Sequence, residues 1–134
     1  MNSNVLRIID ANINRLREGI RVVEDIFRYV YNNKEVAIKL KNLRHLSRLE
    51  NNNDLLLSRD VKNDVLRESI KSEQNRDSLE SILIANFKRA QESSRVLEEL
   101  TKLSSIKDSE NFKYIRYELY NLEIVLTNIT SNSK

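Results

Sequence analysis

The chain has 134 residues, of which 40% are hydrophobic and 32% charged, with no proline, no cysteine and a single glycine. These counts exclude a disulfide scaffold, a cysteine zinc site and a glycine-rich phosphate loop, because each needs several residues that the chain lacks or has only once. The net charge of +3 is small, so it favours anionic small molecules over nucleic acid, whose binding surfaces carry a larger basic excess. No apolar run is long enough to cross a membrane, and the N-terminus lacks the features of a signal peptide. We therefore expect one helical domain, residues 1–134, in the cytoplasm.

Apolar residues recur every three or four positions and predict five helical segments in an all-α bundle. The first segment covers residues 5–31, and the second covers 34–50 with Asn33 as its N-cap. A polar break follows at 51–54. The expected inward residues of these two segments are Ile9, Ile13, Leu16, Ile20, Val23, Phe27, Val30, Val36, Leu40, Leu43 and Leu46.

The remaining segments are less uniform. Residues 55–74 have poor periodicity and are expected to be irregular or a short helix. The fourth segment covers 77–103, where Asp77 and Glu80 have the spacing of a capping box. The fifth covers 109–129, and its inward stripe is Phe112, Ile115, Leu119, Leu122 and Leu126. We expect the tail from residue 130 to fray.

An internal repeat relates the first and fourth segments. Residues 11–25 and 85–99 share the pattern Ala-Asn-x2-Arg-x2-Glu-x2-Arg-Val-x-Glu followed by an acidic residue. The match indicates the duplication of a helical hairpin and predicts that the two segments are pseudo-two-fold partners in the bundle. Each copy places an asparagine, an arginine and a small residue beside its buried stripe, namely Asn12, Arg15 and Gly19, and Asn86, Arg89 and Ser93.

The polar residues of the repeat have two interpretations. Their spacing suits ion pairs along a solvated helix face, which fits Arg17, Glu24 and Arg28 because they point away from the stripe. Arg15 and Arg89 lie at the margin of the stripe, where an arginine needs a partner such as a phosphate or a carboxylate. The small residue at Gly19 allows either a close helix crossing or room for a ligand.

Three further groups have a structural and a functional interpretation. Arg44 and His45 lie in a basic segment, which is either a solvated face or an anion site, and a lone histidine is commonly a partly buried, hydrogen-bonded side chain. Asp60 and Asp64 follow Arg59 in the irregular segment, where aspartates either close turns on their own backbone or hold Mg²⁺. Tyr117 belongs to a tyrosine rim that could also stack on a flat heterocycle.

The motifs taken together resemble a known family. Residues 7–19 resemble the signature R-x-x-D-A-N-x-N-R-x-R-E-G, and the motifs at 43–45, 58–60, 64–65, 85–92 and 116–120 follow in the same order. The pattern is similar, over about residues 5–126, to the small monofunctional hydroxymethylpyrimidine phosphate kinase of thiamine biosynthesis. That domain occurs alone or fused ahead of thiamine-phosphate synthase. One departure is Leu66, which stands where the family pattern has glycine and bears on the path of the loop.

The resemblance implies a kinase that transfers the γ-phosphoryl group of ATP to 4-amino-5-hydroxymethyl-2-methylpyrimidine phosphate, with ATP and Mg²⁺ required. From the resemblance and the residue types, we expect catalytic roles for Arg15, Arg59, Arg89 and Asp60. We expect substrate or phosphate binding by Asn12, Asn14, Asn86, Arg44, His45 and Tyr117. The expected Mg²⁺ ligands are Asp10, Asp60 and Asp64.

The competing interpretation is a non-catalytic helical bundle that docks on thiamine-phosphate synthase or another partner. Convergence of Asn12, Arg15, Asn86 and Arg89 in one cleft favours the enzyme, whereas mutual ion pairs with Glu18 and Glu92 favour a scaffold. Nucleic-acid binding by the basic segment is a weaker third interpretation, and we expect neither a nucleic acid nor a membrane as partner. The sequence is compatible with a homo-oligomer.

Overall fold

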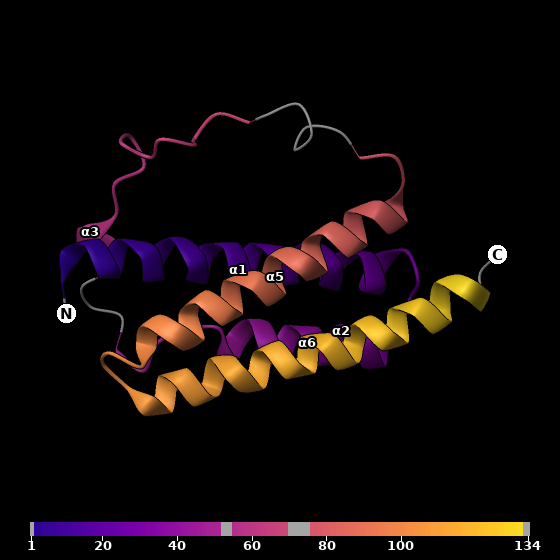
Figure 1. The fold of residues 1–134 in the computed structure, drawn as a ribbon. Coiled ribbons are helices and arrows are strands. Elements are labelled where there is room, and N and C mark those ends of the chain that lie inside the picture. Colours follow the sequence, from indigo (N-terminus) through magenta and orange to yellow (C-terminus); the bar gives the residue numbers. More distant parts are fainter. Residues whose placement is uncertain (1, 52–54, 70–75, 133–134) are drawn as a thin grey trace.

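The computed structural model describes residues 2–51, 55–69 and 76–132, and all regular structure in these ranges is helical (Figure 1). The all-α prediction is therefore confirmed. The helices are α1 (Ser3–Tyr29), α2 (Lys34–Leu46), α3 (Leu55–Ser58), α5 (Leu79–Thr101) and α6 (Ile106–Asn132). None of these described helices combines the length and the low polarity that crossing a bilayer requires.

The bundle consists of two helical hairpins. Helices α1 and α2 form the first hairpin, α5 and α6 form the second, and α1 packs along α5 between them. Figure 1 shows that α5 runs opposite to α1. The two copies of the repeat therefore face each other at the centre of the bundle, as the duplication predicts.

The close approach of α1 and α5 explains the single glycine. A Cβ atom at Gly19 would lie 3.2 Å from the backbone oxygen of Asn86 and 3.5 Å from the Cβ atom of Ala90. Contacts this short leave little space for a side chain between two packed helices. Of the two interpretations of Gly19, the structure supports the close helix crossing.

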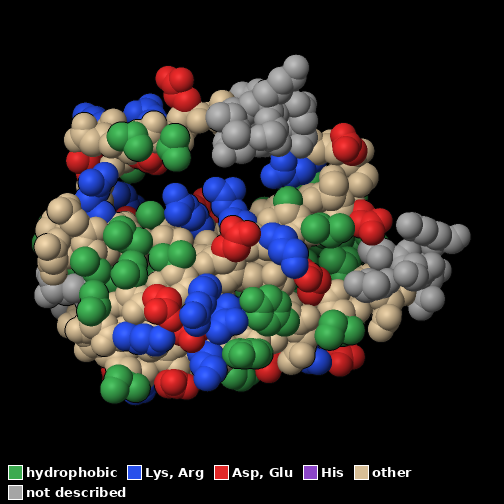
Figure 2. All heavy atoms as spheres, viewed as in Figure 1, with side chains coloured by type: hydrophobic (Ala, Val, Ile, Leu, Met, Phe, Trp, Pro, Cys, Tyr) green, Lys and Arg blue, Asp and Glu red, His purple; other side chains and the backbone are tan. Residues whose placement is uncertain are grey.

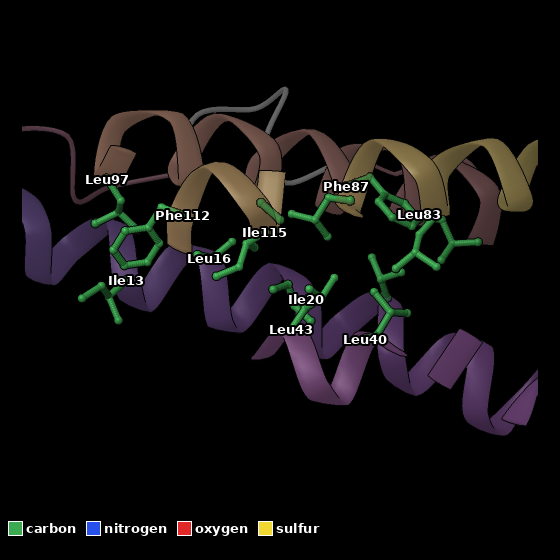
Figure 3. Close-up of a cluster of buried hydrophobic side chains, with 14 of the residues drawn as sticks. Ile13, Leu16, Ile20, Leu40, Leu43, Leu83, Phe87, Leu97, Phe112 and Ile115 are labelled. Atoms are coloured by element: carbon green, nitrogen blue, oxygen red, sulfur yellow. The ribbon is translucent and has the colours of Figure 1, made fainter. Parts of the chain in front are cut away.

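The core lies where the four long helices meet, and it follows the predicted stripes closely. Figure 3 shows side chains from α1, α2, α5 and α6 pointing toward one another, among them Leu16, Leu43, Phe87 and Phe112. The predicted burial is wrong for two residues, since Val30 is 54% exposed and Leu46 is 41% exposed. Val30 caps the end of α1 and Leu46 is the last residue of α2, so the helical period no longer holds them against the core.

The helix ends differ from the prediction where local hydrogen bonds decide them. Asn33 is confirmed as the N-cap of α2, because its side chain accepts a hydrogen bond from the amide of Val36. The capping box predicted for Asp77 and Glu80 is wrong, since Ser78 and Ser81 form it instead.

Two other boundaries moved. Helix α2 stops at Leu46 rather than at residue 50, and Ser47 turns its hydroxyl back to donate to the carbonyl of Leu43. Helix α6 begins three residues before the predicted start and continues to Asn132. The expectation of fraying is therefore wrong for residues 130–132, which are helical. Residues 133–134 lie outside the described range.

Each hairpin contains one buried ion pair, and the two glutamates occupy matching positions of the repeat. Glu24 of α1 accepts hydrogen bonds from Nε and Nη2 of Arg44 on α2, at 2.7 and 3.3 Å. Glu98 of α5 accepts from Nε and Nη2 of Arg116 on α6, at 3.1 and 2.8 Å. Both glutamates are at most 5% exposed. The expectation that Glu24 lies on a solvated face is therefore wrong, because a partner on the next helix takes its charge.

Candidate functional site

A groove lies between the first half of α1 and the segment that follows α3. Its volume is about 830 Å³, which is within the range of small-molecule sites. Figure 2 shows an opening beneath residues 59–69, with Lys and Arg side chains along its lower edge. Seven of the predicted site residues line the groove: Asp10, Asn12, Asn14, Arg15, Arg59, Asp60 and Asp64.

The floor of the groove contains an ion pair between α1 and the segment after α3. Arg59 donates from Nε and Nη2 to the two carboxylate oxygens of Asp10, at 2.7 and 2.8 Å. The Asp10 side chain is 8% exposed and that of Arg59 is 40% exposed. The hydrogen bond to Asp10 raises the pKa of Arg59. Arg59 thus stays charged while part of its guanidinium faces the groove.

The opposite wall of the groove is built by aspartate turns. Asp60 accepts hydrogen bonds from the side chain and the backbone amide of Asn63, at 2.7 and 3.2 Å. The side-chain bond is the main cause of a lowered pKa at Asp60. Asp64 accepts from the amide of Leu66 at 3.0 Å. Both aspartates therefore close turns on nearby residues, and Asp64 keeps one carboxylate oxygen outside the described hydrogen bonds.

The loop accepts Leu66 without strain. Among the described residues other than glycine, Asn32 alone has a positive φ angle. Leu66 therefore has a backbone conformation that any residue adopts, and a glycine is not required there for the path that the loop takes.

The three predicted metal ligands lie along the same groove but do not form a ready site. No three His, Asp or Glu residues within the described ranges come together as a metal-binding group. Both oxygens of Asp10 already accept from Arg59. Both oxygens of Asp60 also accept, from Asn63, whereas Asp64 has only one oxygen in a described hydrogen bond. An exposed aspartate can exchange such a bond for a cation, and Mg²⁺ commonly takes only one or two carboxylates when phosphate oxygens supply the rest.

The two arginines at the margin of the stripe differ from the other arginines of the repeat. Arg21 pairs with Asp25 one turn later on α1, and their counterparts Arg95 and Glu99 pair on α5. Arg15 and Arg89 are both exposed. Within the described parts of the chain, neither makes an ion pair or a side-chain hydrogen bond. The ion-pair interpretation therefore holds for the second arginine of each copy. The expectation that Arg15 and Arg89 need a partner is not supported, because both side chains are exposed and water can solvate their charge.

The asparagines of the repeat form matching local bonds. Asn12 donates to the carbonyl of Ile8, and Asn86 donates to the carbonyl of Ile82, each one turn earlier in its helix. Asn12 lines the groove, but Asn86 and Arg89 are not among its described lining residues. The predicted convergence of both copies in one cleft is therefore not seen, because only Asn12 and Arg15 of α1 line the groove.

Three further predicted binding residues lie away from the groove. Arg44 is held by the buried Glu24, His45 is exposed near the end of α2 rather than partly buried, and Tyr117 is 52% exposed on α6. Arg116 stacks over the ring of Tyr117, and Tyr120 meets that ring edge-on. Helix α6 packs on α5 and α2 rather than on α1, so the structure does not bring Tyr117 to the groove.

Sequence reasoning did not predict four polar lining residues, Asn4, Arg7, Glu18 and Asn63. Arg7 donates to the backbone oxygen of Asp60 at 3.2 Å and so helps to hold the wall of the groove. Its position was readable in principle, because Arg7 and Asn14 are seven residues apart and share one helix face. The contact of Asn63 with Asp60 depends on a turn that periodicity does not show.

Comparison with known proteins gives a family and several long relatives. A family model described as the ThiD2 family matches residues 7–125. A thiamine-phosphate synthase of Nostoc punctiforme is 39% identical over 120 residues, which are 89% of this chain and 34% of the relative. A thiamine-phosphate synthase of Prochlorococcus marinus is 38% identical over 129 residues, 96% of this chain and 37% of the relative.

A relative with lower sequence identity has the same name and a similar coverage. A thiamine-phosphate synthase of Rhodopirellula baltica is 34% identical over 139 aligned positions, which cover 97% of this chain and 37% of the relative. The chain thus spans about a third of the length of the curated relatives that it matches. No solved structure matches it.

Proposed function

Since the chain belongs to the ThiD2 family, we propose that it acts in thiamine biosynthesis as a hydroxymethylpyrimidine phosphate kinase. The reaction would transfer the γ-phosphoryl group of ATP to 4-amino-5-hydroxymethyl-2-methylpyrimidine phosphate and form the diphosphate. Relatives named thiamine-phosphate synthase support the pathway. The kinase step rests on the sequence motifs and on the groove.

The observation that carries the proposal is the gathering of motif residues in one groove. The α1 motif contributes Asp10, Asn12 and Arg15, and the motif after α3 contributes Arg59 and Asp60. These segments are about 50 residues apart in the chain, so their meeting is a property of the fold. A groove that joins cationic side chains to amide groups suits a ligand with both phosphate and heterocyclic parts.

The charges of the groove suit a nucleotide that arrives with its cation. Three guanidinium groups line it and four carboxylates outnumber them by one. These charged lining residues are Arg7, Arg15, Arg59, Asp10, Glu18, Asp60 and Asp64. A metal-free polyphosphate would contact the guanidinium groups directly but would meet no net positive charge, so the cation is expected to strengthen its binding. Asp60 and Asp64 are the residues that would hold Mg²⁺ beside the phosphates, where the ion neutralises charge that develops during transfer.

Within this proposal, the chain acts mainly by positioning and by charge stabilisation. The oxygen of the acceptor phosphate is already ionised, so it needs no strong general base to form a bond to the γ-phosphorus as the bond to the β-phosphate oxygen breaks. Arg15 is exposed in the groove without a described partner and would bind a phosphate group. Asn14 would hydrogen-bond the aminopyrimidine, because an amide both donates and accepts.

The test replaces Arg15 and a matched arginine on the same helix. Arg15→Ala should lower kcat/KM by about tenfold or more, which is the scale of one charge-assisted phosphate contact. Arg21→Ala removes an exposed arginine that pairs with Asp25 outside the groove, so its kcat/KM should change little. Equal activity of Arg15→Ala and the wild type would remove Arg15 from the binding role.

A second candidate function is docking on the synthase. The matching relatives carry this region within chains about three times longer, so in them the region is covalently joined to the rest of the protein. A chain without kinase activity that co-purifies with separately expressed thiamine-phosphate synthase would favour this second function. A chain that turns over the pyrimidine phosphate without that partner would favour the first.

A further inference from the structure

We propose that Asp10 is a positioning residue that aims Arg59 at a phosphate group in the groove, rather than a ligand of Mg²⁺. The proposal rests on the proposed function for the identity of the phosphate compound. The geometry of the two side chains supplies the argument.

The ion pair leaves part of Arg59 available. A guanidinium has five N–H donors, and Nε and Nη2 each direct one to Asp10 at 2.7 and 2.8 Å. Three donors remain on a side chain that is 40% exposed and lines the groove. The bidentate contact also fixes the plane of the guanidinium, so the remaining donors have a defined direction.

The Asp10–Arg59 pair has no counterpart in the second copy of the repeat. The buried glutamates that hold the two hairpins, Glu24 and Glu98, occupy matching positions of the two repeat copies. The counterpart of Asp10 in the second copy is Ile84, which is 45% exposed. A helix in this architecture therefore packs without a carboxylate at that position, and Asp10 serves the groove of the first copy alone.

The position of the pair links the two walls. Asp10 lies on α1, and Arg59 begins the segment that carries Asp60 and Asp64. Arg7 adds one contact to the carbonyl of Asp60. Loss of the Asp10 carboxylate would release Arg59 and loosen that wall, whereas a Mg²⁺ ligand would affect binding only when the metal is present.

The experiment is a double-mutant cycle read by calorimetric titration with two probes, inorganic pyrophosphate without metal and Mg·ATP. Asp10→Asn and Arg59→Gln should each weaken pyrophosphate binding by about tenfold. The double variant should bind within about twofold of Arg59→Gln, because Asp10 acts through Arg59. Glu98→Gln is the matched control, since it breaks a buried ion pair between α5 and α6 and should leave both affinities unchanged.

The outcomes separate this proposal from the proposed function. Additive losses in the double variant, or a loss for Asp10→Asn with Mg·ATP but not with metal-free pyrophosphate, would overturn the positioning role. A wild-type chain that does not bind metal-free pyrophosphate would overturn it as well. If the cycle behaves as expected but the wild type does not phosphorylate the pyrimidine, the proposed function fails and the positioning role stands.

Discussion

Replacing Glu24 by glutamine is expected to lower the free energy of unfolding by about 3 kcal/mol. The Glu24 side chain is 3% exposed and that of its partner Arg44 is 14% exposed, with the nearest atoms 2.7 Å apart. Removing one partner of a buried ion pair costs about 3–5 kcal/mol, because the other charge stays buried without compensation. The lower end applies here, because some water reaches Arg44 and the glutamine oxygen still accepts a hydrogen bond.

The assay is urea denaturation followed by circular dichroism at 222 nm. For a chain of this length the loss corresponds to a fall in Tm of roughly 10 °C. The exposed pair of Glu35 and Lys39 is the matched control, and Glu35→Gln should cost about 0.5 kcal/mol or less. A double variant with methionine at both Glu24 and Arg44 should recover most of the stability. A loss below about 1 kcal/mol for Glu24→Gln would show that the Glu24–Arg44 pair is not a buried, stabilising contact.

Two further predictions concern the helix crossing and the wall of the groove. Gly19→Val should lower the free energy of unfolding by about 1–3 kcal/mol, as overpacking does. The reason is that even a Cβ atom would lie 3.2 Å from the backbone oxygen of Asn86. A urea midpoint equal to that of the wild type would contradict the close crossing. Asn63→Ala should raise the pKa of Asp60 toward its ordinary value of 3.8, since the Asn63 side chain is the main cause of the lowered pKa. The NMR titration of Asp60 measures this, and an unchanged pKa would show that the hydrogen bond does not hold the carboxylate ionised.

The helices and their core were predictable because local spacing encodes them. A stripe of apolar residues at steps of three and four marks the buried face of α1 and of α6, and the structure buries Leu16 and Phe112 fully. The repeat also predicted that α1 and α5 are partners. Helix ends were less predictable, because Ser78 and Ser47 act through single side-chain hydrogen bonds that compete with neighbouring candidates of similar chemistry.

The burial of Glu24 was not predicted, and the reason is physical. Its partner Arg44 lies 20 residues away on another helix, and helix periodicity describes only contacts within one helix. The signal that could have found it was the repeat, since both copies keep a glutamate at this position.

The candidate site was predictable only in part. The α1 motif and the motif after α3 meet in one groove as the resemblance implies, but Arg44 and Tyr117 lie elsewhere. A motif does not separate residues that hold the fold from residues that contact a ligand. The contact between Asp10 and Arg59 could not be read from the sequence, because a metal ligand and a partner of an arginine both call for a carboxylate.

The most direct test of the proposed kinase is a coupled assay of ADP release by the purified chain with ATP and Mg²⁺. One reaction contains the hydroxymethylpyrimidine monophosphate and the other contains the unphosphorylated alcohol. The account predicts ADP and pyrimidine diphosphate with the monophosphate alone, because the acceptor phosphate is both the nucleophile and the group that the arginines bind. A helical, folded chain that releases no ADP above background with either acceptor would contradict it.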